Sequence, residues 1–311
     1  MKLVFFGTST FGVASLDSLE KSRHEIQAIV TVPDKPQGRH LKVDHSPIKE
    51  WAIKNKIPHF ETARGKLNEI QPELKAITPD LFVVISFGAI LPESLLAIPK
   101  ILSLNVHSSL LPRWRGAAPM HWALMSGDSE TGVSVIRMTP KLDAGDILTQ
   151  KKTAILDDDD IVSLEARLSQ LGAKALLETL SLLEQKRAVF HPQDQKQATV
   201  ARKLTKNDGH IDWKLKVAEI HNRVRAMKEW PSSYSFYKGK RVILIRTQFS
   251  TPGVENSGPG VILSASVKSG IAVAAGDGVV RICRLQLEGK KALDSKEFLR
   301  GFTIEEGQFF E

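Results

Sequence analysis

Continuous apolar runs in the first third of the chain predict strands of a buried sheet. Residues 2–6 and 81–85 are almost entirely apolar, and the first run ends at Gly7. Strands covered by helices on both faces have this composition, because neither face meets water. Residues 10–21 follow the first run with an apolar side chain at about every third position, which predicts an amphipathic helix. This order of elements predicts an α/β fold with a mostly parallel sheet.

Further periodic segments extend this pattern to residue 184. The predicted strands are residues 26–32 and 131–138, and the predicted helices are residues 47–55, 119–126 and the pattern that ends at residue 184. Four acidic residues at 157–160 precede the last helix. Acidic side chains at that place cap the free N–H groups and complement the helix dipole, so we give them no catalytic part.

The last third of the chain has a different pattern. Residues 188–205 show no clear period, and residues 214–227 predict a helix with one apolar face. Short strand patterns separated by glycine or proline turns follow at 235–237, 241–247, 260–264, 271–275 and 279–287. Several short strands at such spacing predict a small barrel. We therefore predict a first domain at 1–187, a basic linker at 188–206 and a β-barrel domain at 207–311.

The composition agrees with two ordinary globular domains. A chain of 311 residues is longer than a single core usually supports, and 42% hydrophobic with 25% charged residues is typical of soluble proteins. The single cysteine, Cys283, cannot form an internal disulfide, and no residue spacing matches a metal site. No apolar stretch is long enough to span a bilayer. We expect a cytoplasmic protein that needs no metal and contacts no membrane.

The positive charge is concentrated in one segment. The whole chain carries a net charge of +8, and residues 186–228 contain eleven Lys and Arg against four acidic residues. A solvated helix face explains many basic runs. However, an excess that falls almost wholly in one segment is the pattern expected for contact with a phosphate backbone. We predict that this segment contacts nucleic acid.

Asn105 and His107 are the first candidate catalytic residues. The apolar residues around them predict a short strand, in which side chains two positions apart point the same way. An amide donor beside an imidazole suits a reaction that develops charge on an oxygen while a proton moves. For a bare N-x-H spacing, a turn asparagine beside a packed histidine is the commoner explanation.

The residues that follow form a much more specific motif. The segment His107-Ser108-Ser109-Leu110-Leu111-Pro112-Arg113-Trp114-Arg115-Gly116 resembles the signature of the 10-formyltetrahydrofolate-dependent formyltransferases. The resemblance runs from Gly7-Thr8 through Gly289-Lys290-Lys291-Ala292. It implies a Rossmann-like N-terminal formyltransferase domain and a C-terminal oligonucleotide-binding-like barrel.

The resemblance also implies a reaction. The formyl group of 10-formyltetrahydrofolate, the co-substrate, would pass from N10 to the α-amine of methionine on initiator tRNA. Asn105 would stabilise the oxyanion, and His107 would help to relay the proton. Asp143 follows a strand on a glycine-containing loop, where an aspartate is most often a turn former. Its match to the D-x-G-D loop of the family implies that it faces and orients His107.

The binding residues are implied in the same way. The pterin pocket would be formed by Phe87, Gly88, Ile90, Leu91, Pro92, Ser109, Leu110, Leu111 and Pro112, although a simple turn explains residues 87–92 equally well. The loop at 31–47 resembles an insertion that reaches the acceptor end of the tRNA. The implied contacts with tRNA or methionine are Phe11, Arg39, Lys42, Arg202, Lys203 and Lys206. The partner would be initiator methionyl-tRNA, and we expect a monomer.

Other functions compete with this interpretation. The same core serves enzymes that formylate amino-sugar nucleotides or glycinamide ribonucleotide, and a hydrolase of 10-formyltetrahydrofolate is conceivable on these residues. The basic linker favours an RNA substrate over an amino sugar. A non-catalytic nucleic-acid-binding module would explain the charge and the barrel, but it leaves Asn105, His107 and Asp143 without a reason.

Overall fold

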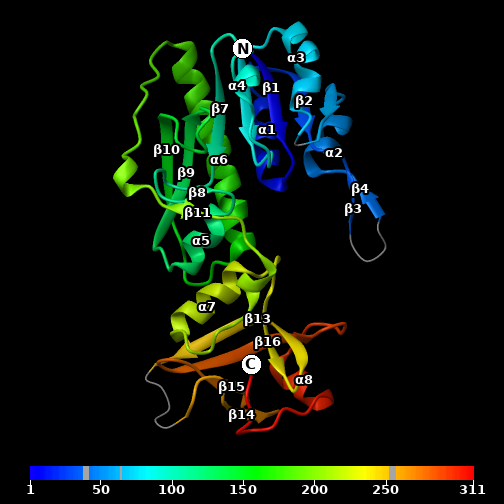
Figure 1. Cartoon of the computed structure of the whole chain (residues 1–311), viewed down its shortest axis with the longest axis vertical. Coiled ribbons are helices and arrows are strands. Elements are labelled where there is room, and N and C mark those ends of the chain that lie inside the picture. The colour runs from blue at the N-terminus through cyan, green and yellow to red at the C-terminus, as the bar shows by residue number, and fades with distance from the viewer. Residues whose placement is uncertain (38–41, 64, 252–256) are drawn as a thin grey trace. The chain divides into compact units, whose positions relative to one another are not determined.

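The computed structural model describes residues 1–37, 42–63, 65–251 and 257–311, which form two compact units (Figure 1). Unit 1 comprises Met1–Pro119, Glu130–Ala154 and Glu165–Arg202, and unit 2 comprises Met120–Ser129, Ile155–Leu164 and Lys203–Glu311. The domain boundaries expected at residues 187 and 206 stay a prediction. In the structure, residues 188–202 pack with unit 1.

Unit 1 is built on a seven-stranded sheet with the strand order β10-β9-β7-β6-β1-β2-β5. The strands are β1 (Lys2–Gly7), β2 (Glu25–Thr31), β5 (His59–Glu61), β6 (Leu81–Ile85), β7 (Leu102–His107), β9 (Glu130–Arg137) and β10 (Ile147–Ala154). The pairs from β7 to β5 are parallel, and β9 is antiparallel to both β7 and β10. The mostly parallel sheet predicted from the apolar runs is confirmed.

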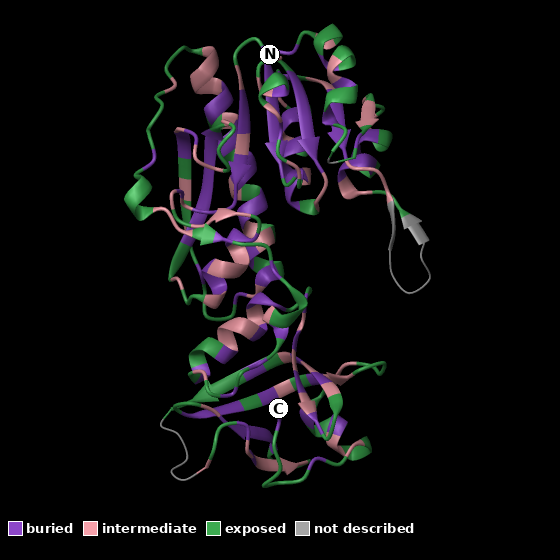
Figure 2. Ribbon diagram, viewed as in Figure 1, coloured by how far each residue is buried: buried purple, intermediate pink, exposed green. Residues whose placement is uncertain are grey.

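Helices cover this sheet because both of its faces are apolar. On one face, Phe6 of β1, Val30 of β2 and Phe82 of β6 form a core with Leu74 of α3 (Gln71–Ile77). Over another part of the sheet, the hydroxyl of Thr179 in helix α6 (Ile161–Glu184) lies 2.9 Å from the hydroxyl of Thr149 in β10, within hydrogen-bond distance. Figure 2 shows the central strands buried along most of their length.

The predicted helices of this part of the chain are all present. They are α1 (Val13–Glu20), preceded by a 3-10 turn at Thr10–Gly12, α2 (Pro47–Lys54), α5 (Pro119–Met125) and α6 (Ile161–Glu184); α3 and the short α4 (Glu93–Leu96) are additional. The Asp160 carboxylate accepts hydrogen bonds from the backbone N–H groups of Val162 and Ser163, which confirms the capping role for Asp160. None of the helices in the described ranges combines the length and apolar composition that a membrane span requires.

Several short strands occur where the sequence shows no strand pattern. The expected loop at 31–47 contains a hairpin of β3 (Lys35–Gln37) and β4 (Lys42–Asp44). In addition, β8 (Arg115–Gly116) pairs in parallel with β11 (Val200–Ala201), which lies in the expected linker. Strands of two or three residues are too short to show a period, and they depend on the partner that they meet in space.

Unit 2 contains a six-stranded antiparallel sheet. The strands are β12 (Ser233–Tyr237), β13 (Lys240–Ser250), β14 (Ile262–Ser266), β15 (Gly270–Ala274), β16 (Val279–Leu287) and β17 (Leu293–Asp294), and the order is β12-β13-β16-β15-β14 with β17 beside β16. Residues 307–311 bond to Phe236 on edge strand β12 and to Gly260 and Ile262 at the other edge strand, β14. The C-terminal segment therefore lies between the two edge strands. The separate C-terminal β domain predicted from the short strand patterns is confirmed, and its sheet is antiparallel.

The core of unit 2 contains several aromatic side chains, and the indole N–H among them is hydrogen-bonded. Helix α7 (Val217–Ala226) and helix α8 (Ser295–Gly301) contribute Ile220 and Phe298 to the same cluster as Tyr237 and Phe310. The indole of Trp213, which is also part of the cluster, donates a 2.9 Å hydrogen bond to the hydroxyl of Ser235. The pairing of a buried indole N–H avoids the cost of an unsatisfied donor.

One histidine of unit 2 lacks such a partner. His121 lies on α5, and its Nδ1 atom is buried without a hydrogen-bond partner among the described residues. Burial lowers the pKa of His121 to about 4, because the imidazolium loses its hydration. The folded protein therefore keeps this ring neutral at a pH where the unfolded chain protonates it.

We expect His121→Leu to make the protein less sensitive to acid. As the pH falls from about 6.5 toward 4, His121 binds a proton in the unfolded state but not in the folded state. Proton binding stabilises the unfolded state, so the histidine lowers the free energy of unfolding in this pH range. Between pH 7 and 5 this effect amounts to about 2 kcal/mol, and the leucine variant lacks it. Urea denaturation at both pH values measures the difference between variant and wild type. A difference that is the same at pH 7 and pH 5 would contradict a neutral buried imidazole.

Candidate active site

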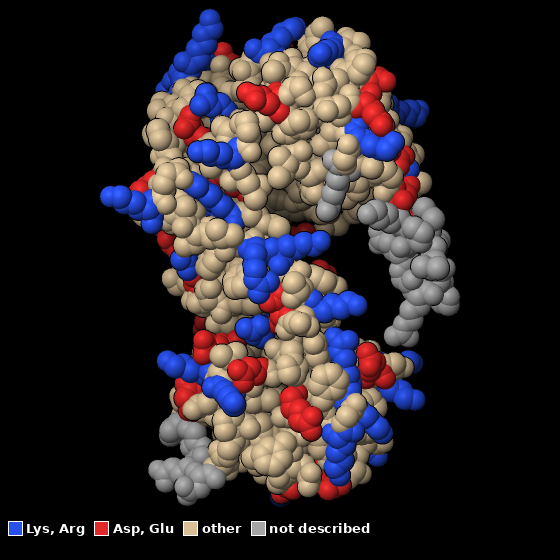
Figure 3. All heavy atoms as spheres, viewed as in Figure 1, with Lys and Arg blue, Asp and Glu red and all other residues tan. Residues whose placement is uncertain are grey.

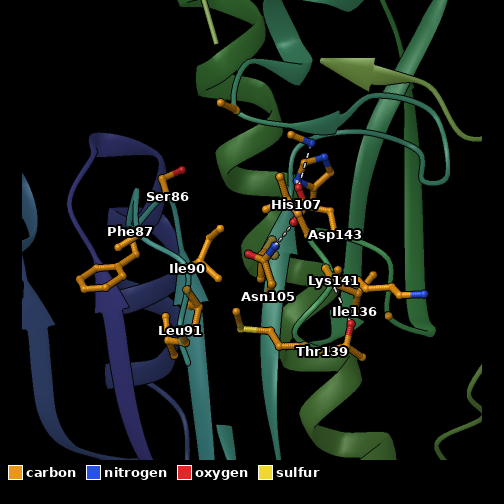
Figure 4. Close-up of a pocket in the computed structure, with 18 of the residues that line it drawn as sticks. Ser86, Phe87, Ile90, Leu91, Asn105, His107, Ile136, Thr139, Lys141 and Asp143 are labelled. Atoms are coloured by element: carbon orange, nitrogen blue, oxygen red, sulfur yellow. Dashed lines mark hydrogen bonds and ion pairs between the residues drawn. The ribbon is translucent and has the colours of Figure 1, made fainter. Parts of the chain in front are cut away.

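Strand β7 presents the first two candidate residues at the edge where the parallel strands end. Asn105 is paired with Val84 of β6 on one side and with Ile136 of β9 on the other, which places it near the middle of the sheet. His107 is the last residue of the strand. In Figure 4 both side chains point to the same side, as their spacing of two predicts.

Asp143 joins them from the loop after β9. Its Oδ1 accepts a 3.2 Å hydrogen bond from the Asn105 amide, and its Oδ2 accepts a 2.9 Å bond from the backbone N–H of Gly116. The Nδ1 atom of His107 lies 3.6 Å from the same Oδ2. The structure thus brings the three candidate catalytic side chains together, as the family resemblance implied for Asp143.

The second ring nitrogen of His107 is also engaged. Nε2 lies 2.8 Å from the backbone carbonyl of Trp114, and a carbonyl only accepts, so Nε2 carries the proton in this contact. Nδ1 then faces the Asp143 carboxylate, to which it donates when the ring is doubly protonated. The imidazole and the carboxylate are 6% and 9% exposed, so this interaction is only weakly screened by water.

These residues border a cavity of about 460 Å³, which is within the usual range of small-molecule sites. Its walls come from three segments: residues from 84 to 91 at and after the end of β6, residues from 105 to 119 around the end of β7, and residues from 136 to 145 at and after the end of β9. In Figure 4, Ile90 and Leu91 lie across the cavity from Asn105 and Asp143. The arrangement provides an apolar slot with polar groups at one end.

The structure divides the residues expected to bind folate into two sets. Phe87, Gly88, Ile90 and Leu91 line the cavity, although the ring of Phe87 packs against Phe6 in the core. The cavity lining, as the described residues define it, does not include Pro92, Ser109, Leu110, Leu111 and Pro112.

Residues of the second set, those outside the cavity lining, form hydrogen bonds within their own loop and with the sheet. Ser109 is fully buried, and its hydroxyl donates to the carbonyl of Arg113 at 2.6 Å. Ser134 of β9 donates to the carbonyl of Ser109, and Gln150 of β10 donates to the carbonyl of Leu111. We call the segment 107–116 the signature loop. It is hydrogen-bonded to the sheet by polar side chains of β9 and β10, which lie outside the loop's own sequence.

Sequence reasoning missed one wall of the cavity. Met138, Thr139, Pro140, Lys141 and Leu142 line it, and so does Ser86 on the opposite side. The available signal was the position of these residues between a predicted strand and Asp143, because segments that follow strands at the carboxyl edge of an α/β sheet commonly form the ligand site.

The residues expected to bind tRNA or methionine do not border this cavity in the part of the chain that the structure describes. Phe11 is 3% exposed, and its carbonyl accepts a hydrogen bond from Ser169. Lys42 begins strand β4, and Arg39 lies outside the described residues. Arg202, Lys203 and Lys206 are exposed. Figure 3 shows Lys and Arg side chains on the visible face of both units, with acidic side chains between them.

Comparison with known proteins identifies the class. A family described as "Formyl transferase" matches residues 1–180, and one described as "Formyl transferase, C-terminal domain" matches residues 203–303. The first match contains the whole cavity and the three polar side chains beside it. The chain has the fold and the two domains of a formyltransferase.

Proteins with similar sequences along the whole chain identify the family within this class. Methionyl-tRNA formyltransferase from Sulfurihydrogenibium sp. (strain YO3AOP1) is 39% identical over 312 residues, covering 100% of both chains. The enzyme of the same name from Citrifermentans bemidjiense is 42% identical over 99% of this chain and 95% of its own. The chain belongs to the methionyl-tRNA formyltransferase family.

Solved structures share the fold at lower identity. An N-formyltransferase from Helicobacter canadensis, solved with folinic acid and dTDP-3-aminofucose, is 18% identical with a TM-score of 0.67 and covers 91% of this chain and 99% of its own. HypX from Aquifex aeolicus in complex with tetrahydrofolic acid is 18% identical with a TM-score of 0.66, covering 100% of this chain and 50% of its own. Methionyl-tRNA formyltransferase from Clostridium thermocellum is 16% identical with a TM-score of 0.54, covering 83% and 95%.

Proposed function

We propose that this enzyme transfers the formyl group of 10-formyltetrahydrofolate to the α-amine of methionine carried by initiator tRNA, giving N-formylmethionyl-tRNA. The observation that carries the proposal is the similarity to methionyl-tRNA formyltransferases along the whole chain, through both units. The folate ligands of two structural neighbours, folinic acid and tetrahydrofolic acid, support a reduced folate as the formyl donor.

The geometry of the site accounts for the first chemical step. The amine attacks the formyl carbon, and the carbonyl oxygen becomes an oxyanion in a tetrahedral intermediate. An amide nitrogen carries two hydrogens, and the bond to Asp143 uses one of those on Asn105. The second hydrogen can therefore donate to the oxyanion. The carboxylate fixes the direction of the amide before the reaction begins, so little reorganisation is needed.

The second step moves a proton. Attack makes the amine positively charged, and its proton must leave before the bond between the formyl carbon and N10 breaks. The His107–Asp143 pair, with Nδ1 and Oδ2 3.6 Å apart, accepts this proton and returns it to N10 as tetrahydrofolate departs. The chain's own residues carry out every transfer, with no covalent enzyme intermediate.

The cavity suits the pterin end of the donor. Ile90, Leu91, Met138 and Leu142 give it apolar walls, and a flat heterocycle buries well between such side chains. Backbone groups at Gly88 can supply hydrogen bonds to the edge of the ring. We assign no pterin contact to Ser109, because its hydroxyl is engaged within the signature loop.

Exposed basic residues are the proposed contacts for tRNA. Arg202, Lys203 and Lys206 form a cluster within five positions, and Lys42 and Arg39 stay predictions of the same kind. Phe11 stays the predicted contact of the methionyl side chain, although the residue is buried in this structure. We infer a monomeric cytoplasmic enzyme, and gel filtration measures the molecular mass of the protein.

An amino-sugar nucleotide is the second candidate acceptor, because the Helicobacter canadensis neighbour was solved with one. We expect formyl transfer from 10-formyltetrahydrofolate to methionyl-initiator tRNA and none to dTDP-3-aminofucose. Product formation with each acceptor, measured at equal enzyme concentration, distinguishes the two. Faster formylation of the sugar would assign the enzyme to the other class, and release of formate with neither acceptor preferred would indicate a hydrolase.

Asn105→Ala and Asp143→Ala should each fold normally and lose activity. Removal of one oxyanion donor typically lowers kcat by ~10²–10³. Loss of the carboxylate should be of similar size, because it removes both the proton acceptor and the group that orients Asn105. Steady-state kinetics with methionyl-tRNA gives kcat, and circular dichroism verifies folding. A folded variant with a wild-type rate would refute the role of that residue.

Affinity for tRNA should fall steeply with added salt, because basic side chains release counterions from the phosphates. Lys206→Ala should reduce the slope of log affinity against log salt by ~0.7–0.9, the value of one phosphate contact. Lys21, an exposed lysine directly after helix α1, provides the control: Lys21→Ala should leave the slope unchanged. Equal slopes for Lys206→Ala and wild type would exclude Lys206 as a phosphate contact.

A further inference from the structure

The segment 193–201 runs along the signature loop and bonds to it repeatedly. Thr199 accepts a 2.8 Å hydrogen bond from the backbone N–H of Trp114 through its hydroxyl and a 2.9 Å bond from Arg115 N–H through its carbonyl. Ala201 accepts a 2.8 Å bond from the backbone N–H of Ala117. At Gly116, whose φ is +121°, a Cβ would fall 2.5 Å from the Ala201 carbonyl. The two segments therefore fit closely along the whole end of the loop.

Gln193 extends this contact to the loop that carries Asp143. The residue is 7% exposed, and both ends of its amide are used. Nε2 donates to the carbonyl of Asp143 at 2.8 Å and to the carbonyl of Gly145 at 2.7 Å. Oε1 accepts from the guanidinium of Arg115 twice, from Nε at 2.9 Å and from Nη2 at 2.7 Å. One side chain thus joins the Asp143 loop to the signature loop.

The same two loops are joined at a second point. Asp143 Oδ2 accepts the backbone N–H of Gly116, the residue directly after Arg115. The first connection holds the backbone of the Asp143 loop, and the second holds the carboxylate itself. Asp143 has a φ of +50°, a conformation that costs energy for a side chain other than glycine and persists only where its surroundings fix it.

We propose that Gln193 is a positioning residue for catalysis: by bridging Arg115 and the carbonyls of Asp143 and Gly145, it holds the Asp143 carboxylate against Asn105 and His107. This inference rests on the proposed function. Gln193 does not line the cavity, so it acts through Asp143 and does not touch the substrates.

The chemistry of the bridge explains why an amide occupies this position. It must donate at one end, where two carbonyls lie, and accept at the other, where a guanidinium lies. A glutamate would keep the contact with Arg115 but place an oxygen at about the distance where the amide nitrogen now donates. Two oxygens without a hydrogen between them repel, so the Asp143 loop would have to move.

The experiment compares two substitutions at Gln193 with a matched control. We expect Gln193→Ala and Gln193→Glu each to lower kcat by about 10- to 100-fold. KM for methionyl-tRNA and for the folate should stay within about threefold, because the residue is not part of the cavity. Gln197→Ala is the control: Gln197 is exposed in the same segment and its side-chain amide donates to Asp194, away from the Asp143 loop, so kcat should be unchanged. A wild-type kcat for folded Gln193→Glu would overturn the proposal.

A double-substitution cycle separates positioning from mere structural support. If Gln193 acts through Asp143, then Gln193→Ala should slow the Asp143→Ala enzyme by less than about twofold. Single-turnover reactions with excess enzyme can measure the low rates of the Asp143→Ala enzyme and of the double variant. A further loss of tenfold or more in the Asp143→Ala background would overturn the proposal, because the effect of Gln193 would then be independent of the carboxylate. If Gln193→Ala does not fold, Gln193→Glu takes its place in the cycle.

The order of measurement keeps this proposal distinct from the proposed function. Wild-type enzyme is first assayed with methionyl-tRNA and with dTDP-3-aminofucose. If only the sugar is formylated, the proposed acceptor is wrong, and the Gln193 cycle is carried out with the sugar. If methionyl-tRNA is formylated and Gln193→Glu has the kcat of the wild type, the proposed acceptor is supported and the positioning role of Gln193 is refuted.

Discussion

The site depends on one nearly buried carboxylate. A charged group with so little contact with water is stable only when donors surround it, and Asp143 receives them from Asn105 and the backbone of Gly116, with His107 close by. These donors belong to a strand end and to a separate loop. Convergence of the strand and both loops is therefore needed to supply these hydrogen bonds, and the catalytic geometry is obtained with it.

The topology explains why the Asp143 loop needs such support. Strand β9 runs antiparallel to β7, so its last residue, Arg137, lies beside Leu104 and not beside His107. The chain must turn back to bring Asp143 to the end of β7. The return is tight: a Cβ on Gly145 would lie 1.7 Å from the Arg137 carbonyl. The bonds from Gln193 hold the chain where it makes this turn.

Much of the fold could be predicted because its signals are local. The apolar run of β6 and the i, i+2 spacing of Asn105 and His107 depend on neighbouring residues alone. Strand β11 has no such signal: its two residues form a strand only because β8 meets them. For the same reason, the segment 193–201 has the pattern of a linker, although it packs against the signature loop. The contribution of Asp143 was implied by family resemblance and not by its local sequence, which is that of a turn.

Apolar packing and hydrogen bonds have different roles in unit 1. The helices are held against the sheet by apolar packing, which is strong but non-directional and tolerates small shifts. A reacting centre tolerates little, because catalytic groups must stay within about 0.5 Å of their productive positions. Hydrogen bonds fix direction as well as distance, and Ser134, Gln150, Thr199 and Gln193 supply them at the ends of the signature loop and the Asp143 loop. Polar residues around the site thus add the precision that the apolar core cannot give.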